Sequence, residues 1–238
     1  MSQQNSIDMQ TNATDYTTSL LKSVFGAIPI VGPAAQELLG IIIPNQRMDR
    51  VVRFVEALGK ELEELKEDVD SLNEKLADEK YSSLFYKACV GSADAYSNER
   101  IEYIKNIFVY GLHQTDLQTY KSEGLLNLLN RVTDIEIVYL RFYYLSKWNL
   151  ERFREYQKIT GIDILQPVIH GGMTREAIDD EVAKRIYLNN LLSYGLLEIE
   201  IDKKGKEKYK CSSVGDLLIR TIDKEDIWTN LKKERWEE

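Results

Sequence analysis

Cysteine, histidine and proline are scarce in this sequence. Its 238 residues include two cysteines, two histidines, four prolines and thirteen glycines. Cys89 and Cys211 lie far apart, so they favour a reducing compartment and inert thiols over a disulfide framework. His113 and His170 have no metal-ligand spacing to each other, to cysteine or to carboxylates. Few helix breakers, together with apolar residues at helical spacing, predict a mainly α protein.

The sequence also lacks the motifs that carry common chemistry. It contains neither a phosphate-binding G-x-x-x-x-G-K-[ST] loop nor a G-x-S-x-G nucleophile elbow. The run His170-Gly171-Gly172 is similar to an oxyanion loop, but that loop needs the elbow beside it. Carboxylates are too numerous on the expected helix surfaces to single out an acid and base pair. We therefore expect a non-enzymatic protein that uses no cofactor and no metal.

Positive charge is in deficit, with a formal net charge of -8 at pH 7. This charge disfavours unspecific binding to nucleic acid or anionic lipid, although a local basic patch can override it. Residues 1–16 are polar and are expected to form a flexible tail. They lack the basic region of a secretory signal, so we expect a cytoplasmic protein, which would associate with the inner face of the membrane if its apolar segment binds lipid.

What the sequence does have is one long apolar stretch, at 18–45. Between residues 24 and 43 only Gln36 and Glu37 are strongly polar, over a length close to a membrane span. Pro29 and Pro33 argue against one unbroken helix and predict an apolar helical hairpin over 17–44. Its candidate membrane or core residues are Phe25, Ile28, Ile30, Val31, Glu37, Leu38, Leu39, Ile41, Ile42 and Ile43.

Two interpretations of this hairpin stay open at the level of sequence. In one, the hairpin packs as core of the helical bundle. In the other, it enters or lies on a membrane, and Arg47, Arg50 and Arg53 form the cytoplasmic flank that the positive-inside rule expects. Glu37 would be costly in lipid unless several copies assembled around it, so the membrane interpretation implies an oligomer.

A heptad pattern follows the apolar stretch and predicts a long helix over 45–78. Apolar residues recur there at alternating spacings of three and four, from Met48 to Leu76. The residues expected to form an oligomer seam are Val55, Leu58, Leu62, Leu65, Val69 and Leu72. Pairing with a second copy and pairing with an antiparallel helix of the same chain are both consistent with this pattern.

Residues 80–160 are expected to complete a helical domain that spans 17–160. Helices are predicted near 82–96, 98–112, 119–132 and 134–148. The last of these starts at a Thr133 and Glu136 capping box. It carries an aromatic stripe, which is more typical of core packing than of a base-stacking surface.

Residues 161–238 have a different pattern, which predicts strands as well as helices. Thr174 caps a helix that ends at Gly195, two strands follow around Gly205, and Ser213 opens another helix. Over 174–222 this order resembles the last half of a winged-helix domain. The resemblance implies DNA binding through the helix before the wing, although winged helices also serve as protein-binding modules.

The charges of this segment are mixed. The helix before the wing carries four carboxylates and has no obvious basic face, whereas the wing is rich in lysine. The wing lysines are suited to contacting phosphates, or to keeping an exposed hairpin soluble. The candidate contacts to nucleic acid or to a partner are Lys184, Arg185, Lys203, Lys204, Lys206, Lys208 and Lys210.

Two functional hypotheses follow from the order of the segments. In the first, the chain is a bacterial-type membrane-acting effector or toxin-like protein, such as those of phage defence, that oligomerises through its helical part. In the second, it is a soluble winged-helix regulator of DNA or a protein-interaction adaptor whose apolar hairpin is core. The expected partners are further copies of the chain, membrane lipid and another protein, with nucleic acid supported more weakly.

Overall fold

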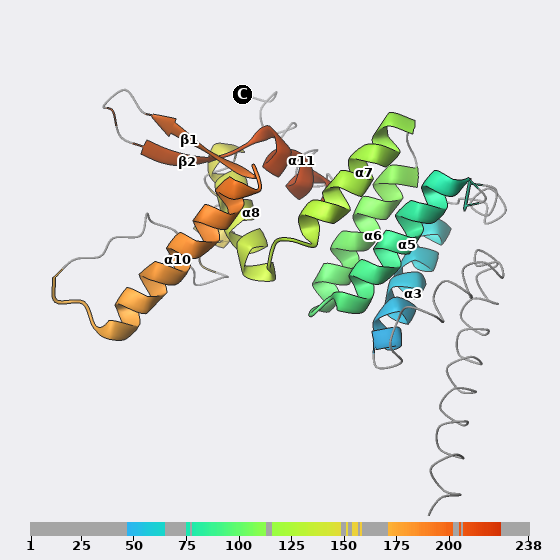
Figure 1. The fold of residues 1–238 in the computed structure, drawn as a ribbon, viewed down its shortest axis with the longest axis horizontal. Coiled ribbons are helices and arrows are strands. Elements are labelled where there is room, and N and C mark those ends of the chain that lie inside the picture. The colour runs from blue at the N-terminus through green and yellow to red at the C-terminus, as the bar shows by residue number, and fades with distance from the viewer. Residues whose placement is uncertain are drawn as a thin grey trace, which may run out of the picture. The chain divides into compact units, whose positions relative to one another are not determined.

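The computed structural model shows a mainly helical protein with one small antiparallel sheet, which confirms the predicted mainly α class (Figure 1). It describes residues 47–64, 75–76, 78–112, 116–148, 151, 154–156, 158, 171–201, 205 and 207–224. The helices are α3 (Met48–Glu64), α5 (Glu79–Asp94), α6 (Asn98–Leu112), α7 (Asp116–Leu129), α8 (Asp134–Trp148), α10 (Arg175–Ser193) and α11 (Ser213–Ile222). The strands are β1 (Leu197–Ile201) and β2 (Glu207–Cys211). The chain divides into two compact units after Leu126.

The first unit is built around the packing of α3, α5 and α6 on one another. At its centre three phenylalanine rings, one from each helix, meet with centroids 5.6 to 6.2 Å apart. Phe54, Phe85 and Phe108 are all buried. Because such ring pairs favour tilted and edge-to-face geometry, they add to the burial term and fix how the three helices pack.

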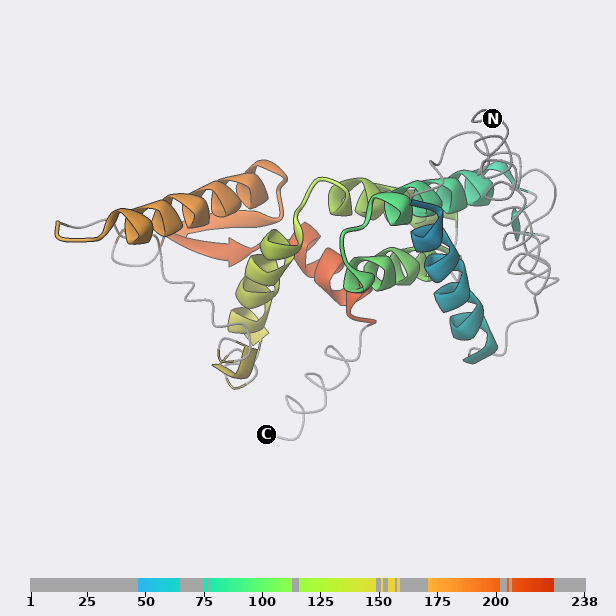
Figure 2. The same cartoon turned by 90° about the horizontal axis from the view of Figure 1, so that it is seen from below.

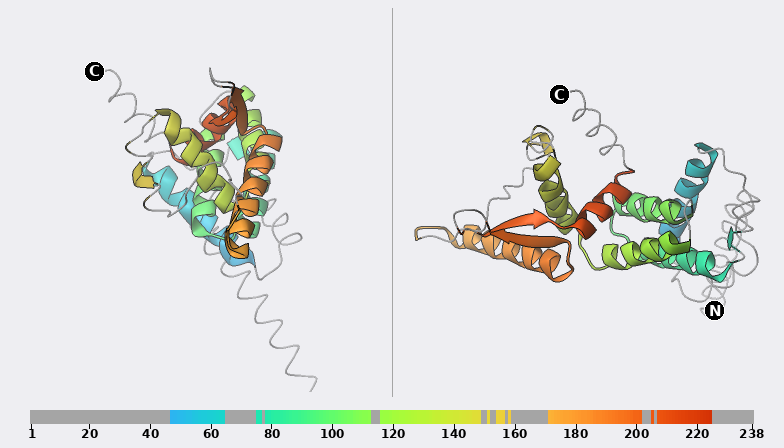
Figure 3. Two further views of the ribbon diagram at one scale, coloured as in Figure 1. Left: turned by 90° about the vertical axis from the view of Figure 1, so that its left-hand side faces the viewer. Right: turned by 90° about the horizontal axis from the view of Figure 1, so that it is seen from above.

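Helices α5, α6 and α7 lie side by side (Figure 3). Gly111 near the end of α6 allows a close approach, because a Cβ there would lie 2.7 Å from a Leu84 side-chain carbon and 2.8 Å from the Ser122 hydroxyl. An ion pair between Lys87 and Glu123 links α5 to α7.

The first half of the heptad pattern lies in α3, where it packs within the chain. Val55, Leu58 and Leu62 are buried against the first unit's own helices. These three residues are thus covered by helices of the same chain, and assembly with further copies stays a prediction. Leu65, Val69 and Leu72 lie outside the described residues, as does the apolar hairpin over 17–44.

The second unit is centred on α8, which packs against α10, α11 and β2. The sequence interpretation assigned α8 to a helical domain over 17–160 and began the C-terminal module at 161. In the structure α8 belongs to the same compact unit as that module. Its Ile137, Leu140 and Tyr144 are buried in this unit, where α8 packs against α10, α11 and β2. The other buried side chains of this unit include residues of α10, of the turn after it, of the hairpin and of α11: Leu188, Leu191, Leu196, Leu197, Cys211, Leu218, Ile219 and Ile222.

The predicted helix ends and turns of this unit are confirmed. At the capping box, the Thr133 amide donates to Glu136 Oε2 at 2.7 Å, and the Glu136 amide donates to Thr133 Oγ1 at 3.3 Å. Thr174 caps α10, and Gly195 ends it with a φ of 69°. The side chain of Ser212, one residue before the predicted start at Ser213, caps α11. Local side-chain chemistry therefore places these boundaries.

Candidate interaction surfaces of the second unit

The hairpin that follows α10 turns back over that helix and presents two different faces (Figure 2). Its register pairs Glu198 with Lys210 and Glu200 with Lys208 on one face. Glu198 and Lys210 form an ion pair at 3.3 Å. Because each described lysine stands opposite a glutamate, this face carries alternating charge and no net positive patch.

The other face of the hairpin runs from the core into solvent and is apolar except at its outer end, where Glu207 stands opposite Ile201. Leu197 pairs with Cys211 in the core, and both are buried. One step out, Tyr209 packs edge-on against Tyr143 of α8 at a centroid distance of 6.1 Å. Ile199, which stands opposite Tyr209, is 48% exposed, and Ile201 at the next position outward on this face is 68% exposed. The apolar alternation thus continues past the part of the face that the unit itself covers.

Helix α10 also shows apolar side chains on its solvent side. Its inner side holds the buried Leu188 and Leu191, and Tyr187 contacts Tyr139 of α8 at a ring distance of 5.6 Å. Val182 and Ile186, one turn apart, are 43% and 52% exposed. The helix carries three cations against four carboxylates, so these apolar residues do not sit within a basic surface.

The candidate cationic contacts are therefore only partly available to phosphate. Lys184 is ion-paired with Glu181 at 2.7 Å, and Arg185 is exposed. Lys208 and Lys210 stand opposite glutamates in the hairpin. Lys203, Lys204 and Lys206 lie outside the described residues. Nothing in the described part gathers these cations on one surface, which is what phosphate contact favours.

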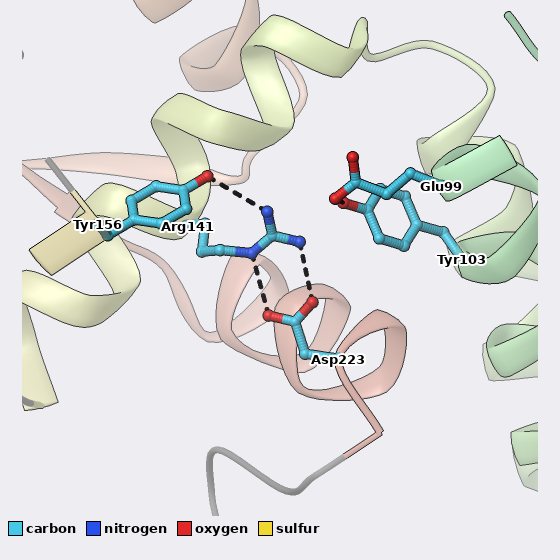
Figure 4. A network of polar contacts seen from close by, with 5 residues as sticks. All are labelled: Glu99, Tyr103, Arg141, Tyr156 and Asp223. Carbon is cyan, nitrogen blue, oxygen red and sulfur yellow. Dashed lines mark hydrogen bonds and ion pairs between the residues drawn. The ribbon is translucent and has the colours of Figure 1, made fainter. Parts of the chain in front are cut away.

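Buried polar contacts hold this unit in shape. Arg141 of α8 makes a two-point ion pair with Asp223 at the end of α11, with N···O distances of 3.1 and 2.9 Å (Figure 4). Its third nitrogen donates to the hydroxyl of Tyr156 at 3.2 Å. On the other side of α8, Asn190 of α10 donates to Glu136 at 2.7 Å. These bonds hold α10 and α11 against α8.

The ionisable side chains with shifted pKa values do not form a reactive centre. Burial raises the pKa of the Cys89 thiol, so this thiol is protonated at neutral pH and a poor nucleophile. Burial likewise raises the pKa values of Tyr143 and Tyr144; at Tyr144 the carboxylates of Asp216 and Asp223 add to the effect and Arg220 opposes it. Among the described residues no group of three or more histidine, cysteine or carboxylate side chains is placed to hold a metal ion.

No protein-family model, curated protein or solved structure matches this chain. Within the part of the chain that the structure describes, no helix has the length and hydropathy needed to cross a bilayer. The candidate hairpin residues of 17–44 fall outside that part.

The exposed apolar residues Val182, Ile186, Ile199 and Ile201 were not among the sequence candidates. A signal for two of them was present, since L-E-I-E-I alternates in β1 and one face of such a strand needs a cover. How far along the strand the unit supplies that cover depends on which elements pack against the hairpin, and this is a tertiary property.

Proposed function

We propose that this chain is a non-enzymatic effector whose C-terminal unit is a winged-helix-type module that binds another protein. The observation that supports this proposal is the exposure of Ile199 and Ile201 on one face of β1, with Glu207 beside them at its outer end. Exposed apolar side chains rimmed by charged ones are typical of protein contact sites. The paired charges of the outer hairpin face and of α10 are poorly suited to phosphate.

Site-specific photocrosslinking in the native host tests this proposal. A photoreactive amino acid at position 201 is expected to yield one defined protein adduct. The matched control is the same amino acid at position 200, whose side chain lies on the opposite, charged face of the same strand. The substitution Ile199→Glu should abolish the adduct from position 201. Equal adducts from both positions, or none from position 201, would contradict the proposal.

Nucleic-acid binding is the competing reading of the same module. Fluorescence anisotropy with labelled duplex DNA and single-stranded RNA at low salt is expected to show no saturable binding. Binding that weakens steeply as salt rises, and that is lost when the wing lysines are changed to glutamine, would favour the DNA regulator instead.

A second function is supported by the apolar stretch at 18–45, which comes close to the length of a membrane span. We propose that this stretch acts on a membrane and that the chain assembles there, because Glu37 needs partners in lipid. Fractionation of the full chain beside a version that starts at Asn45 tests it. The full chain should sediment with membranes and the shortened one should stay in the supernatant; equal distribution of the two would exclude it.

A further inference from the structure

Three arginines near the start of α3, just after the apolar stretch in the sequence, make specific contacts at one end of the first unit. Arg47 pairs with Asp94 at the end of α5. Arg50 donates to the Ala93 carbonyl at 3.1 Å, and Arg53 donates to Asn98 at 2.8 Å. Three arginines, spaced three residues apart, thus bind the first part of α3 to the connection between α5 and α6.

A fully exposed tyrosine stands in that same connection. Only three residues, Ala95, Tyr96 and Ser97, separate α5 from α6. Ala95 is buried and its amide donates to the Ser92 carbonyl at 3.1 Å, while the hydroxyl of Ser97 accepts from the Arg100 amide at 3.1 Å. Tyr96 is 94% exposed between these two fixed neighbours. Its outward position follows from a tight turn with both sides anchored.

The length of the connecting chain limits how far the apolar stretch can end from Arg47. Four residue steps separate Ile43 from Arg47, which span at most about 14 Å of extended chain. Arg47 in turn contacts Asp94, two residues before Tyr96. If residues 18–44 enter lipid, this short connection allows the same end of the first unit to lie at the level of the lipid headgroups.

Side chains suited to that depth are tyrosine, whose ring is apolar and whose hydroxyl is polar, and arginine. The arginines here are offset by Asp49, Asp94 and Glu99, so the end has little net charge. Attraction to anionic lipid is consequently weak, and an aromatic anchor has to supply the contact.

We propose that Tyr96 is an interfacial anchor that seats the α5 to α6 connection in the headgroup region of a phospholipid bilayer. The inference rests on the proposed membrane function of residues 18–44. It adds a named contact residue in the folded first unit and predicts binding to zwitterionic as well as anionic bilayers.

Fluorescent labelling of the full chain tests the anchor directly. Tyr96→Cys is labelled with an environment-sensitive dye, and Tyr120→Cys serves as the matched control. Tyr120 is also an exposed tyrosine, at 64%, but it lies on α7. Gly111 and Ser122 bring this part of α7 to the far end of α6, about 20 Å from the α5 to α6 connection at 1.5 Å per residue. The native thiols Cys89 and Cys211 are both buried, so labelling is confined to the new cysteine.

Phosphatidylcholine vesicles, with and without phosphatidylglycerol, are then added, and sedimentation of the unlabelled full chain is measured in parallel. The expected result is a blue-shifted emission at position 96, with quenching by brominated lipid, and no change at position 120. Tyr96→Ala should weaken vesicle binding severalfold, and Tyr96→Trp should retain it.

The experiment distinguishes failure of the Tyr96 anchor from failure of the proposed membrane function. If the full chain sediments with vesicles but the dye at position 96 behaves like that at 120, the anchor is wrong and the membrane function stands. If the full chain does not sediment with either vesicle type, the membrane function fails and the anchor fails with it.

Discussion

Gly215 in the first turn of α11 gives the sharpest test of how the second unit is packed. A Cβ at this position would lie 2.3 Å from the backbone oxygen of Leu196, and 3.0 Å from both Cys211 Sγ and a Leu140 methyl carbon. Real Cβ atoms essentially never come closer than 3.0 Å to another heavy atom, so backbone must move by at least about 0.7 Å. The oxygen in question accepts the hydrogen bond from the Ser212 amide at 3.1 Å.

The cost of Gly215→Ala follows from three contributions. Overpacking of a filled core costs about 1–3 kcal/mol, and weakening the bond to Leu196 costs about 1 kcal/mol. The better helix propensity of alanine returns about 1 kcal/mol. We expect a net loss of about 2 kcal/mol in the free energy of unfolding, which corresponds to a melting temperature about 8 °C lower for a unit of this size.

Thermal unfolding followed by circular dichroism measures this change, with hydrogen exchange of the β1 amides assigning it to the second unit. Gly124→Ala in α7 is the matched control, because nothing lies within 4 Å of a Cβ there. That variant should gain up to about 1 kcal/mol from helix propensity alone. A Gly215→Ala protein as stable as the control would refute the packing described for α11.

Three further perturbations test other parts of the structure. Gly111→Ala should destabilise the first unit, but less than Gly215→Ala does the second, because its nearest obstacles are side chains, Ser122 among them; equal losses in denaturant titrations would contradict this. Ser212→Ala removes the cap of α11 and a 2.7 Å bond to a backbone carbonyl, for about 1–2 kcal/mol, whereas Ser212→Thr should retain most of it. Burial disfavours the charged form of Lys105. Hydrogen bonds and charges from its two partners, Glu102 and Glu61, outweigh burial and raise the pKa of Lys105. Its folded pKa lies above the unfolded value of 10.5, so its contribution is complete below pH 10.5 and is lost as pH rises through the folded pKa. The stability difference between wild type and Lys105→Met should shrink in that range, and parallel pH profiles would contradict the shift.

The sequence by itself determined most of the local structure in the described part of the chain. The helices at 98–112 and 134–148 have the predicted bounds, and the hairpin around Gly205 has its predicted strands. These features depend on helix caps, turn residues and hydrophobic periodicity. Because such signals act over a few neighbouring residues, they can be predicted from the sequence without knowledge of the fold.

Only the tertiary structure decided how those elements are used. The heptad residues of α3 are consistent with either a second copy or the same chain, and the choice depends on α5 and α6, far away in sequence. Lys208 and Lys210 form part of a basic cluster in the sequence, yet strand register places a glutamate opposite each. Tyr96 is one tyrosine among fourteen until the turn between α5 and α6 points it outward. In each case the partner is set by long-range packing, which a local pattern does not encode.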